Sequence, residues 1–182
     1  MRKPWISIVI LGLALALAPR GAAACGPEII VRFFESSDGD IFDIANKSQE
    51  PWLLVSLEID LKGSAGRLVF DTADGGAGAS MHAPFAANGR EVGLIAQPDV
   101  RDGSERVYLQ FTAFAPGRDF MFVIDLDDRL ESSAGGQAMV DGTEIAGARA
   151  RAILVMPDGA KTHAKGRFNA DGEAWLRGGL CA

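Results

Sequence analysis

Carboxylates gather in one short segment, IDLDD, which contributes Asp125, Asp127 and Asp128. Ca²⁺ takes six to eight oxygen ligands, and carboxylates and main-chain carbonyls of a flexible loop supply them. IDLDD is therefore the leading candidate for a calcium site. Its spacing differs from that of an EF-hand, because Arg129 stands at the fifth position counted from Asp125.

Two further acidic segments, SSDGDIFD and FDTADGG, are weaker candidates for the same ion. Their carboxylates are Asp38, Asp40, Asp43, Asp71 and Asp74. The alternative for all these segments is a solvated turn, in which an aspartate accepts hydrogen bonds from its own backbone. No motif requires a cofactor, and Ca²⁺ is the one candidate ion.

Catalytic signals are few. The chain has two histidines. His82 follows Ser80 closely in sequence, but a triad needs groups that converge in space, and no G-x-S-x-G elbow is present. His163 falls on the outward side of a basic strand. Two histidines and distant cysteines do not form a tetrahedral zinc set. We therefore expect no enzyme, with a hydrolase that uses two Asp or Glu carboxylates as the alternative.

The two cysteines, Cys25 and Cys181, stand near opposite ends of the chain. Thiols pair in oxidising compartments, and domain termini often lie close together, so the sequence predicts a Cys25–Cys181 disulfide. Lipidation of Cys25 remains an alternative, although Ala22 occupies the position where a lipobox usually has leucine. A catalytic thiol would need a nearby histidine.

The first residues indicate export. A basic start, an apolar run over residues 5–18 and the small residues Ala22-Ala23-Ala24 have the pattern of a secretory signal peptide. We expect residues 1–24 to be removed, leaving one domain over residues 25–182 in the periplasm or outside the cell. A retained membrane anchor is the alternative; otherwise no membrane span is expected.

The charge is acidic. The chain has 18 basic and 24 acidic residues, a formal charge of −6. Loss of Arg2, Lys3 and Arg20 with the signal peptide leaves 15 basic residues and a charge of −9. Nucleic acids and anionic lipids bind basic faces, so this balance argues against both as partners.

The body of the chain predicts antiparallel strands. Apolar residues alternate with polar ones over residues 53–61, 107–113 and 120–126, as in half-buried strands. Further strands are expected at residues 29–34, 41–45, 67–70, 91–96, 148–156 and 161–168. With turns such as Pro116-Gly117 between them, the pattern predicts an all-β sandwich, jelly-roll or immunoglobulin-like, with few or no helices. Residues 71–88 and 127–142 are long for loops, so we expect a short strand or helical turn in one of them.

Several segments carry a family resemblance. They are an early D-x-F-x-I-x-N segment (Asp40 to Asn46), an F-x-P-G turn before a strand that ends in D-x-D-D, and an E-I-A-G-A strand start. In these the chain resembles bacterial secreted proteins similar to the sponge aggregation-factor core protein. The resemblance implies an extracellular, all-β, non-enzymatic module in adhesion or matrix.

The functional expectation is a secreted, non-enzymatic module with an adhesion, matrix or cell-envelope binding role. Carbohydrate sites usually display aromatic platforms. The chain has few candidates for such a platform, namely Trp52, Trp175 and Tyr108, and we expect Trp52 to lie in the core. We therefore expect a protein partner or a matrix component rather than sugar. A further alternative is a subunit whose edge strand pairs with a partner chain.

Overall fold

The computed structural model describes residues 26–79, 81–88, 92–133 and 135–179. Ten strands and one short helix follow one another in this part of the chain. They are β1 (Glu28–Phe34), β2 (Asp40–Asn46), β3 (Leu53–Asp60), β4 (Val69–Asp71), β5 (Ala86–Ala87), β6 (Arg106–Phe114), β7 (Asp119–Asp127), α1 (Gly142–Ile145), β8 (Arg149–Val155), β9 (Lys161–Arg167) and β10 (Glu173–Arg177). The prediction of an all-β, antiparallel chain is confirmed.

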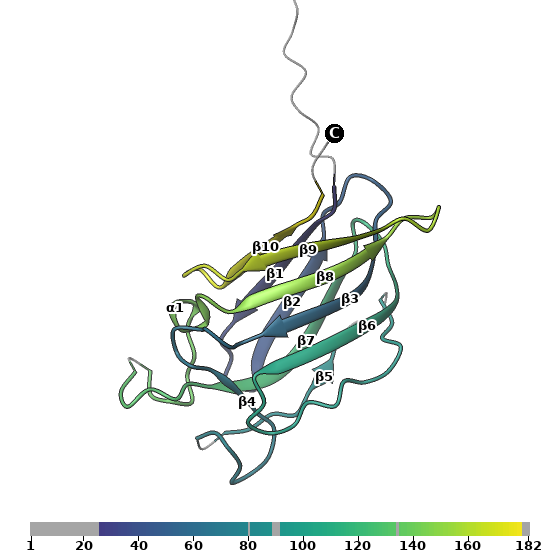
Figure 1. The fold of residues 1–182 in the computed structure, drawn as a ribbon. Coiled ribbons are helices and arrows are strands. Elements are labelled where there is room, and N and C mark those ends of the chain that lie inside the picture. Colours follow the sequence, from purple (N-terminus) through teal and green to yellow (C-terminus); the bar gives the residue numbers. More distant parts are fainter. Residues whose placement is uncertain (1–25, 80, 89–91, 134, 180–182) are drawn as a thin grey trace, which may run out of the picture.

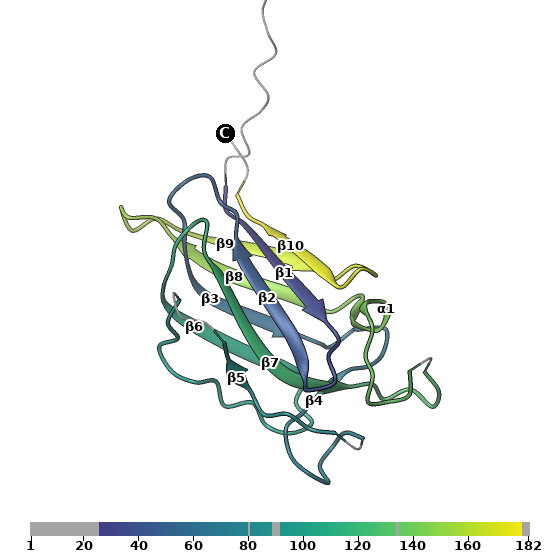
Figure 2. The ribbon, with the colours of Figure 1, turned by 180° about the vertical axis from the view of Figure 1, so that it is seen from behind.

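The strands form one sheet that curls until it nearly closes. The order is β4-β7-β2-β1-β10-β9-β8-β3-β6, with β5 also on β7. Strands β10, β9, β8, β3 and β6 form the wall that faces the viewer in Figure 1. Strands β1, β2 and β7 form the opposite wall, which is in front in Figure 2.

Segments between β4 and β6 cover the gap between the two ends of this order. β5 pairs with β7 through Ala86 and Val123, and Leu94 forms a bridge with Phe111 of β6. On the other side of β4, the amide of Phe70 donates to the carbonyl of Ser104 at 2.9 Å. These contacts satisfy backbone groups that an open sheet edge would expose.

The core lies between the two walls. In β7, Phe120, Phe122, Ile124 and Leu126 are buried in it, as the alternation of the sequence predicts. Phe122 stacks on Phe42 of β2, with ring centroids 4.9 Å apart. The intervening residues of β7 therefore face away from the core, and Asp125 and Asp127 are two of them.

Several expected elements differ in detail. β4 begins two residues later than expected, and residues 92–95 contribute an isolated bridge instead of a strand. The first of the two long loops contains the expected short element, β5, whereas α1 begins only at the last residue of the second, Gly142. Strand β10 was not predicted. The turn at Pro116-Gly117 is confirmed, with Gly117 at φ 77° as a type II turn requires.

The described part of the chain has no helix with the length and apolarity of a membrane crossing. Residues 1–24, the predicted signal peptide, lie outside the described residues.

Candidate metal centre

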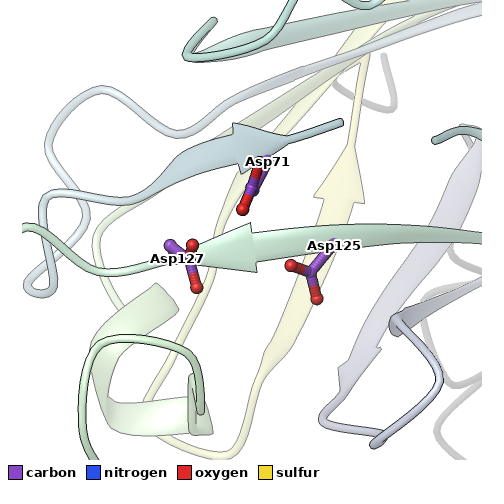
Figure 3. A group of neighbouring side chains, drawn as sticks. All are labelled: Asp71, Asp125 and Asp127. Carbon is purple, nitrogen blue, oxygen red and sulfur yellow. The ribbon is translucent and has the colours of Figure 1, made fainter. Parts of the chain in front are cut away.

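Three aspartates from two strands converge on the outer face of the sheet. In the antiparallel pairing of β4 and β7, Asp71 lies directly opposite Asp125. Asp127 is two residues further along β7, on the same face. One carboxylate oxygen from each of the three lies within 4.8 Å of the others. Figure 3 shows Asp71 on β4 above Asp125 and Asp127 on β7.

All three side chains are buried although they face away from the core. Asp71 is 3 % exposed, Asp125 6 % and Asp127 1 %. One oxygen of each has no hydrogen-bond partner among the described residues: Oδ1 of Asp71, Oδ2 of Asp125 and Oδ1 of Asp127. None of the ion pairs between described residues includes any of the three. Buried polar groups are nearly always paired, and an unpaired buried charge costs free energy. These oxygens have neither a hydrogen-bond donor nor a positively charged partner among the described residues.

The electrostatics of the cluster follow from this burial. Desolvation, and then the charges of Asp127 and Asp71, raise the pKa of Asp125 to about 7. Burial also raises the pKa of Asp127 to about 6, against the lowering effect of the amide of Ala79. The pKa of Asp71 is raised chiefly by burial as well. Each shift reflects the free-energy cost of holding neighbouring carboxylates ionised without a counter-charge.

A glycine-rich loop, residues 72–83, follows β4, and its described residues, 72–79 and 81–83, cover the cluster. It leaves β4 at Asp71 and returns to the same place, where the amide of Ala83 donates to the Asp71 carbonyl at 3.3 Å. Midway, the amide of Ala79 donates to Oδ2 of Asp127 in a short hydrogen bond. A Cβ atom on Gly78 would overlap Oδ2 of both Asp127 and Asp71. The absence of a side chain at Gly78 lets the backbone lie directly on the carboxylates.

A fourth carboxylate, Asp102, holds this loop in place. Its two oxygens accept from the amide of Thr72 at 2.9 Å and from the amide of Ala77 at 2.6 Å. These bonds, the one from Thr72 first, hold the pKa of Asp102 below its usual range. A small pocket of about 150 Å³ opens beside Asp71 and is also lined by Asp74, Gly78 and His82. It gives solvent a route to the edge of the cluster.

Asp40, at the start of β2, is a separate buried carboxyl group next to the cluster. It is 1 % exposed, and its Oδ2 accepts from the amide of Leu126 at 2.9 Å, while Oδ1 has no partner among the described residues. Burial, with nearby Glu35 adding to it, raises the pKa of Asp40 to about 10. The surroundings of Asp40 therefore favour its protonated form.

The remaining predicted ligands lie elsewhere. Asp128 is buried, but its Oδ1 accepts from the amide of Leu130 and it is not part of the cluster. Asp43 pairs with Arg32 at 3.3 Å. Asp38 is exposed on a turn, and Asp74 is exposed on the covering loop. The structure therefore brings together two residues of the leading candidate segment and one of the weaker candidates.

The clustering depends on strand pairing, which the sequence alone did not show. The alternation in β7 can be recognised in the sequence, whereas the pairing of Asp71 with Asp125 cannot. Asp102 was not singled out, and its only sequence signal is the turn sequence Asp102-Gly103.

Other predicted positions are as expected or undescribed. Trp52 packs against the core, and His163 is exposed on β9. Ser80, Cys25 and Cys181 lie outside the described residues. The described residues that flank the cysteines are neighbours: Glu28 pairs with Arg177 across β1 and β10, with a 2.9 Å ion pair between their side chains.

Comparisons of the chain with protein-family models, with curated proteins and with solved structures found no match.

Proposed function

We propose that Asp71, Asp125 and Asp127 bind a divalent cation, Ca²⁺, and that this ion fastens the loop of residues 72–83 onto an exported, non-enzymatic binding module. The observation that carries the proposal is the set of three buried carboxylates with unpartnered oxygens, gathered within 4.8 Å. Two oxygens that flank one Ca²⁺ at about 2.4 Å each lie up to about 4.8 Å apart, so the cluster has the right size.

A cation removes the electrostatic cost of the cluster. Without one, the raised pKa values of Asp125 and Asp127 mean that protons neutralise part of the charge near neutral pH. A divalent ion neutralises the carboxylates together and gives each orphaned oxygen a partner. The chain offers no basic group for this purpose in the ion pairs of its described residues.

The chemistry of the donors favours Ca²⁺ over transition metals. The three converging ligands are all carboxylates, and hard oxygen donors suit Ca²⁺, whereas Zn²⁺ prefers histidine and cysteine. Three carboxylates do not complete a shell of six to eight oxygens. Water that enters beside Asp71 and main-chain carbonyls of the covering loop are the natural source of the others.

The size of the pocket argues against the hydrolase alternative. Sites for small organic ligands usually enclose about 300–1,000 Å³. The pocket that reaches Asp71 has about 150 Å³, and the covering loop closes over Asp127. An ion and a few waters fit this space, whereas a polymer segment positioned between two catalytic carboxylates does not.

The adhesion, matrix or envelope role, export to the periplasm or beyond, and the sandwich type of the fold remain parts of the proposal. They are supported by the signal-peptide pattern, by the resemblance to aggregation-factor-like proteins and by the curled sheet with two walls on one core. A cation that fixes a long surface loop suits such a role, because binding surfaces gain affinity when their loops are held rigid.

Thermal unfolding with and without Ca²⁺ tests the proposal. At free Ca²⁺ a hundredfold above Kd, mass action raises the midpoint of EDTA-treated wild-type protein by about 5–10 °C for a domain of this size. The double variant D125N/D127N should lose the Ca²⁺-dependent shift. Without Ca²⁺ it should unfold at the same temperature as metal-free wild type or higher, because two mutually repelling buried acids are gone.

Asp158→Asn is the control for removing a carboxylate outside the cluster. Asp158 is exposed in the turn between β8 and β9, and its Oδ1 accepts from the amide of Ala160, a bond that asparagine retains. This variant should keep the full Ca²⁺ shift. Equal shifts in wild type and D125N/D127N would refute the proposed site.

A further inference from the structure

The outer faces of β8 and β9 carry a dense basic array on an otherwise acidic chain. In the register of these two strands, Arg149 lies opposite Arg167 and Arg151 lies opposite Lys165. The four side chains line an open groove of about 490 Å³, whose floor is the backbone at Ala150 and Gly166. Like charges directly opposite each other across two strands are destabilising. The repulsion within the array therefore destabilises the isolated domain, and an anionic partner would remove this repulsion.

Most of this charge is not neutralised within the domain. Arg151 pairs with Glu58 at 2.9 Å and lies 4.0 Å from Asp60. In the described part of the chain, no carboxylate forms an ion pair with Arg149, Lys165 or Arg167. All three are exposed. Arg167 donates one hydrogen bond to the carbonyl of Gly147 at 3.4 Å, which leaves its charge uncompensated. The charges of these three residues are therefore available to an anionic ligand.

The array is narrow, and its border on the β3 side is acidic. It is two strands wide, which is about 10 Å including the side chains at its margins. On the β3 side, Glu58 lies opposite Arg151 and Asp60 lies opposite Arg149. On the β10 side, Arg177 lies opposite Lys165, and its side chain is paired with Glu28 at 2.9 Å. A single polyanionic chain fits along this strip, whereas a nucleic-acid duplex or a bilayer surface would also meet the carboxylates of β3.

The exposed aromatic side chains near the array lie on other strands than β8 and β9. Trp175 on β10 is 41 % exposed, and Arg177 lies over its ring at 5.3 Å from the centroid. Tyr108 on β6 is 49 % exposed. The outward side chains of β8 and β9 include no phenyl, phenol or indole ring. Single-stranded nucleic acid is bound by stacking its bases on such rings along the basic track, so this arrangement does not suit it.

We propose that the groove formed by Arg149, Arg151, Lys165 and Arg167 binds a single chain of an acidic polysaccharide through its carboxylate or sulfate groups. The ribbon view shows β8 and β9 side by side on the front wall, with Trp175's strand β10 next to β9 (Figure 1). The groove lies on another wall than the aspartate cluster on β4 and β7. The inference rests on the proposed binding role of the exported module but not on its metal site.

The test is a binding titration of the protein without residues 1–24 with polygalacturonate in EDTA. EDTA separates this inference from Ca²⁺ binding, and it prevents Ca²⁺ bridges to the polymer. Wild type should bind, and the slope of log Kd against log salt should show release of counterions. The double variant R149Q/K165Q should bind about tenfold more weakly, since two unscreened charge contacts are lost. Its salt slope should be smaller.

The control double variant K47Q/R101Q removes the same charge from other surfaces and should bind as wild type does. Lys47 pairs with Asp119 at 3.8 Å, away from β8 and β9, and Arg101 is exposed before β6. Neutral dextran should not bind. Oligo(dT) of matched charge and phosphatidylglycerol vesicles are the competitors: tighter binding of either than of polygalacturonate would overturn the proposal. So would equal affinities of the two double variants for polygalacturonate.

Discussion

Asp71 faces Asp125 directly across the antiparallel pair of β4 and β7, and both carboxyl groups are buried on the face that points away from the core. Like charges directly opposite each other destabilise a sheet. Asp127, two residues along, adds a third carboxylate to the same spot. This arrangement is the centre of the account, because a bound cation turns three mutually repelling acids into three ligands.

Gly78→Ala should weaken both the fold and the metal site. The added Cβ would overlap carboxylate oxygens of Asp127 and Asp71, so the loop of residues 72–83 must move off the cluster. Forcing a methyl group into a packed site costs about 1–3 kcal/mol in the free energy of unfolding. Urea unfolding measures this loss in free energy. The loss measured in EDTA reports the effect on the fold alone, and any additional loss in Ca²⁺ reports weaker binding of the ion.

Gly93→Ala serves as the control for a glycine substitution. Among the described residues, the only atom that a Cβ at Gly93 meets within 4 Å is the side-chain hydroxyl of Thr112, at 3.1 Å. This variant should retain wild-type Ca²⁺ affinity. A Gly78→Ala protein with unchanged Ca²⁺ affinity would show that the loop does not lie on the ion.

The metal-free protein should lose stability as the pH rises. The pKa of Asp125 is raised to about 7 and that of Asp127 to about 6, from 3.8 for an ordinary aspartate. The folded state thus holds more protons than the unfolded chain from about pH 4 to pH 7, so the free energy of unfolding falls as the pH rises through this range. Ca²⁺ binds the ionised carboxylates and therefore competes with protons. Saturating Ca²⁺ should raise the free energy of unfolding by more at pH 8 than at pH 5.

Urea unfolding at pH 5 and pH 8, in EDTA and in Ca²⁺, measures both effects. The D125N/D127N variant should show a flatter pH dependence in EDTA than wild type. A Ca²⁺ effect of the same size at both pH values would contradict competition between the ion and protons.

Two substitutions of Asp40 should distinguish the contribution of its hydrogen bond to stability from that of its charge. The pKa of Asp40 is raised to about 10, mainly by burial, which favours the neutral form, and its Oδ2 accepts from the amide of Leu126. Asp40→Asn keeps a neutral side chain with an acceptor oxygen and should unfold at a urea concentration close to that of wild type. Asp40→Ala leaves the buried amide unpaired and should cost about 1–3 kcal/mol. Equal losses in the two variants would show that Asp40 is needed as an anion.

The cysteine pair can be examined by mass. The flanking residues Glu28 and Arg177 are paired, so the chain segments that lead to Cys25 and Cys181 begin side by side. Protein recovered from the native envelope or medium should start at Cys25 and weigh about 2 Da less than after reduction, as one disulfide requires. A mass increased by acyl chains would instead show that Cys25 is lipidated.

Local patterning was enough to predict most strands but not how they assemble. Alternation in β7 placed Phe120 and Phe122 in the core, and the structure confirms this. β10 was missed because it is short and the adjoining glycines resemble a loop, although Ala174 and Leu176 alternate as buried residues. The curled strand order depends on contacts between distant segments, which no local pattern specifies.

Only part of the candidate site could be predicted from the sequence. Asp125 stands on a strand whose period was visible, but the alternation was followed only to residue 126, and Asp127 was assigned to the next loop. The structure extends β7 to Asp127 and so puts both on one face. Asp71 joins them only through the β4–β7 register, and Asp128 is not part of the cluster. The basic groove was hidden by the overall acidic charge, since Arg149 and Arg167 meet only when β8 and β9 pair.

The most direct test of the central claim is calorimetric titration of Ca²⁺ into EDTA-stripped, buffer-exchanged protein at pH 7.5. The account predicts saturable binding of one ion per chain in wild type and in Asp158→Asn, and no binding heat in D125N/D127N. The absence of binding heat in wild type, together with an unchanged unfolding temperature, would contradict it.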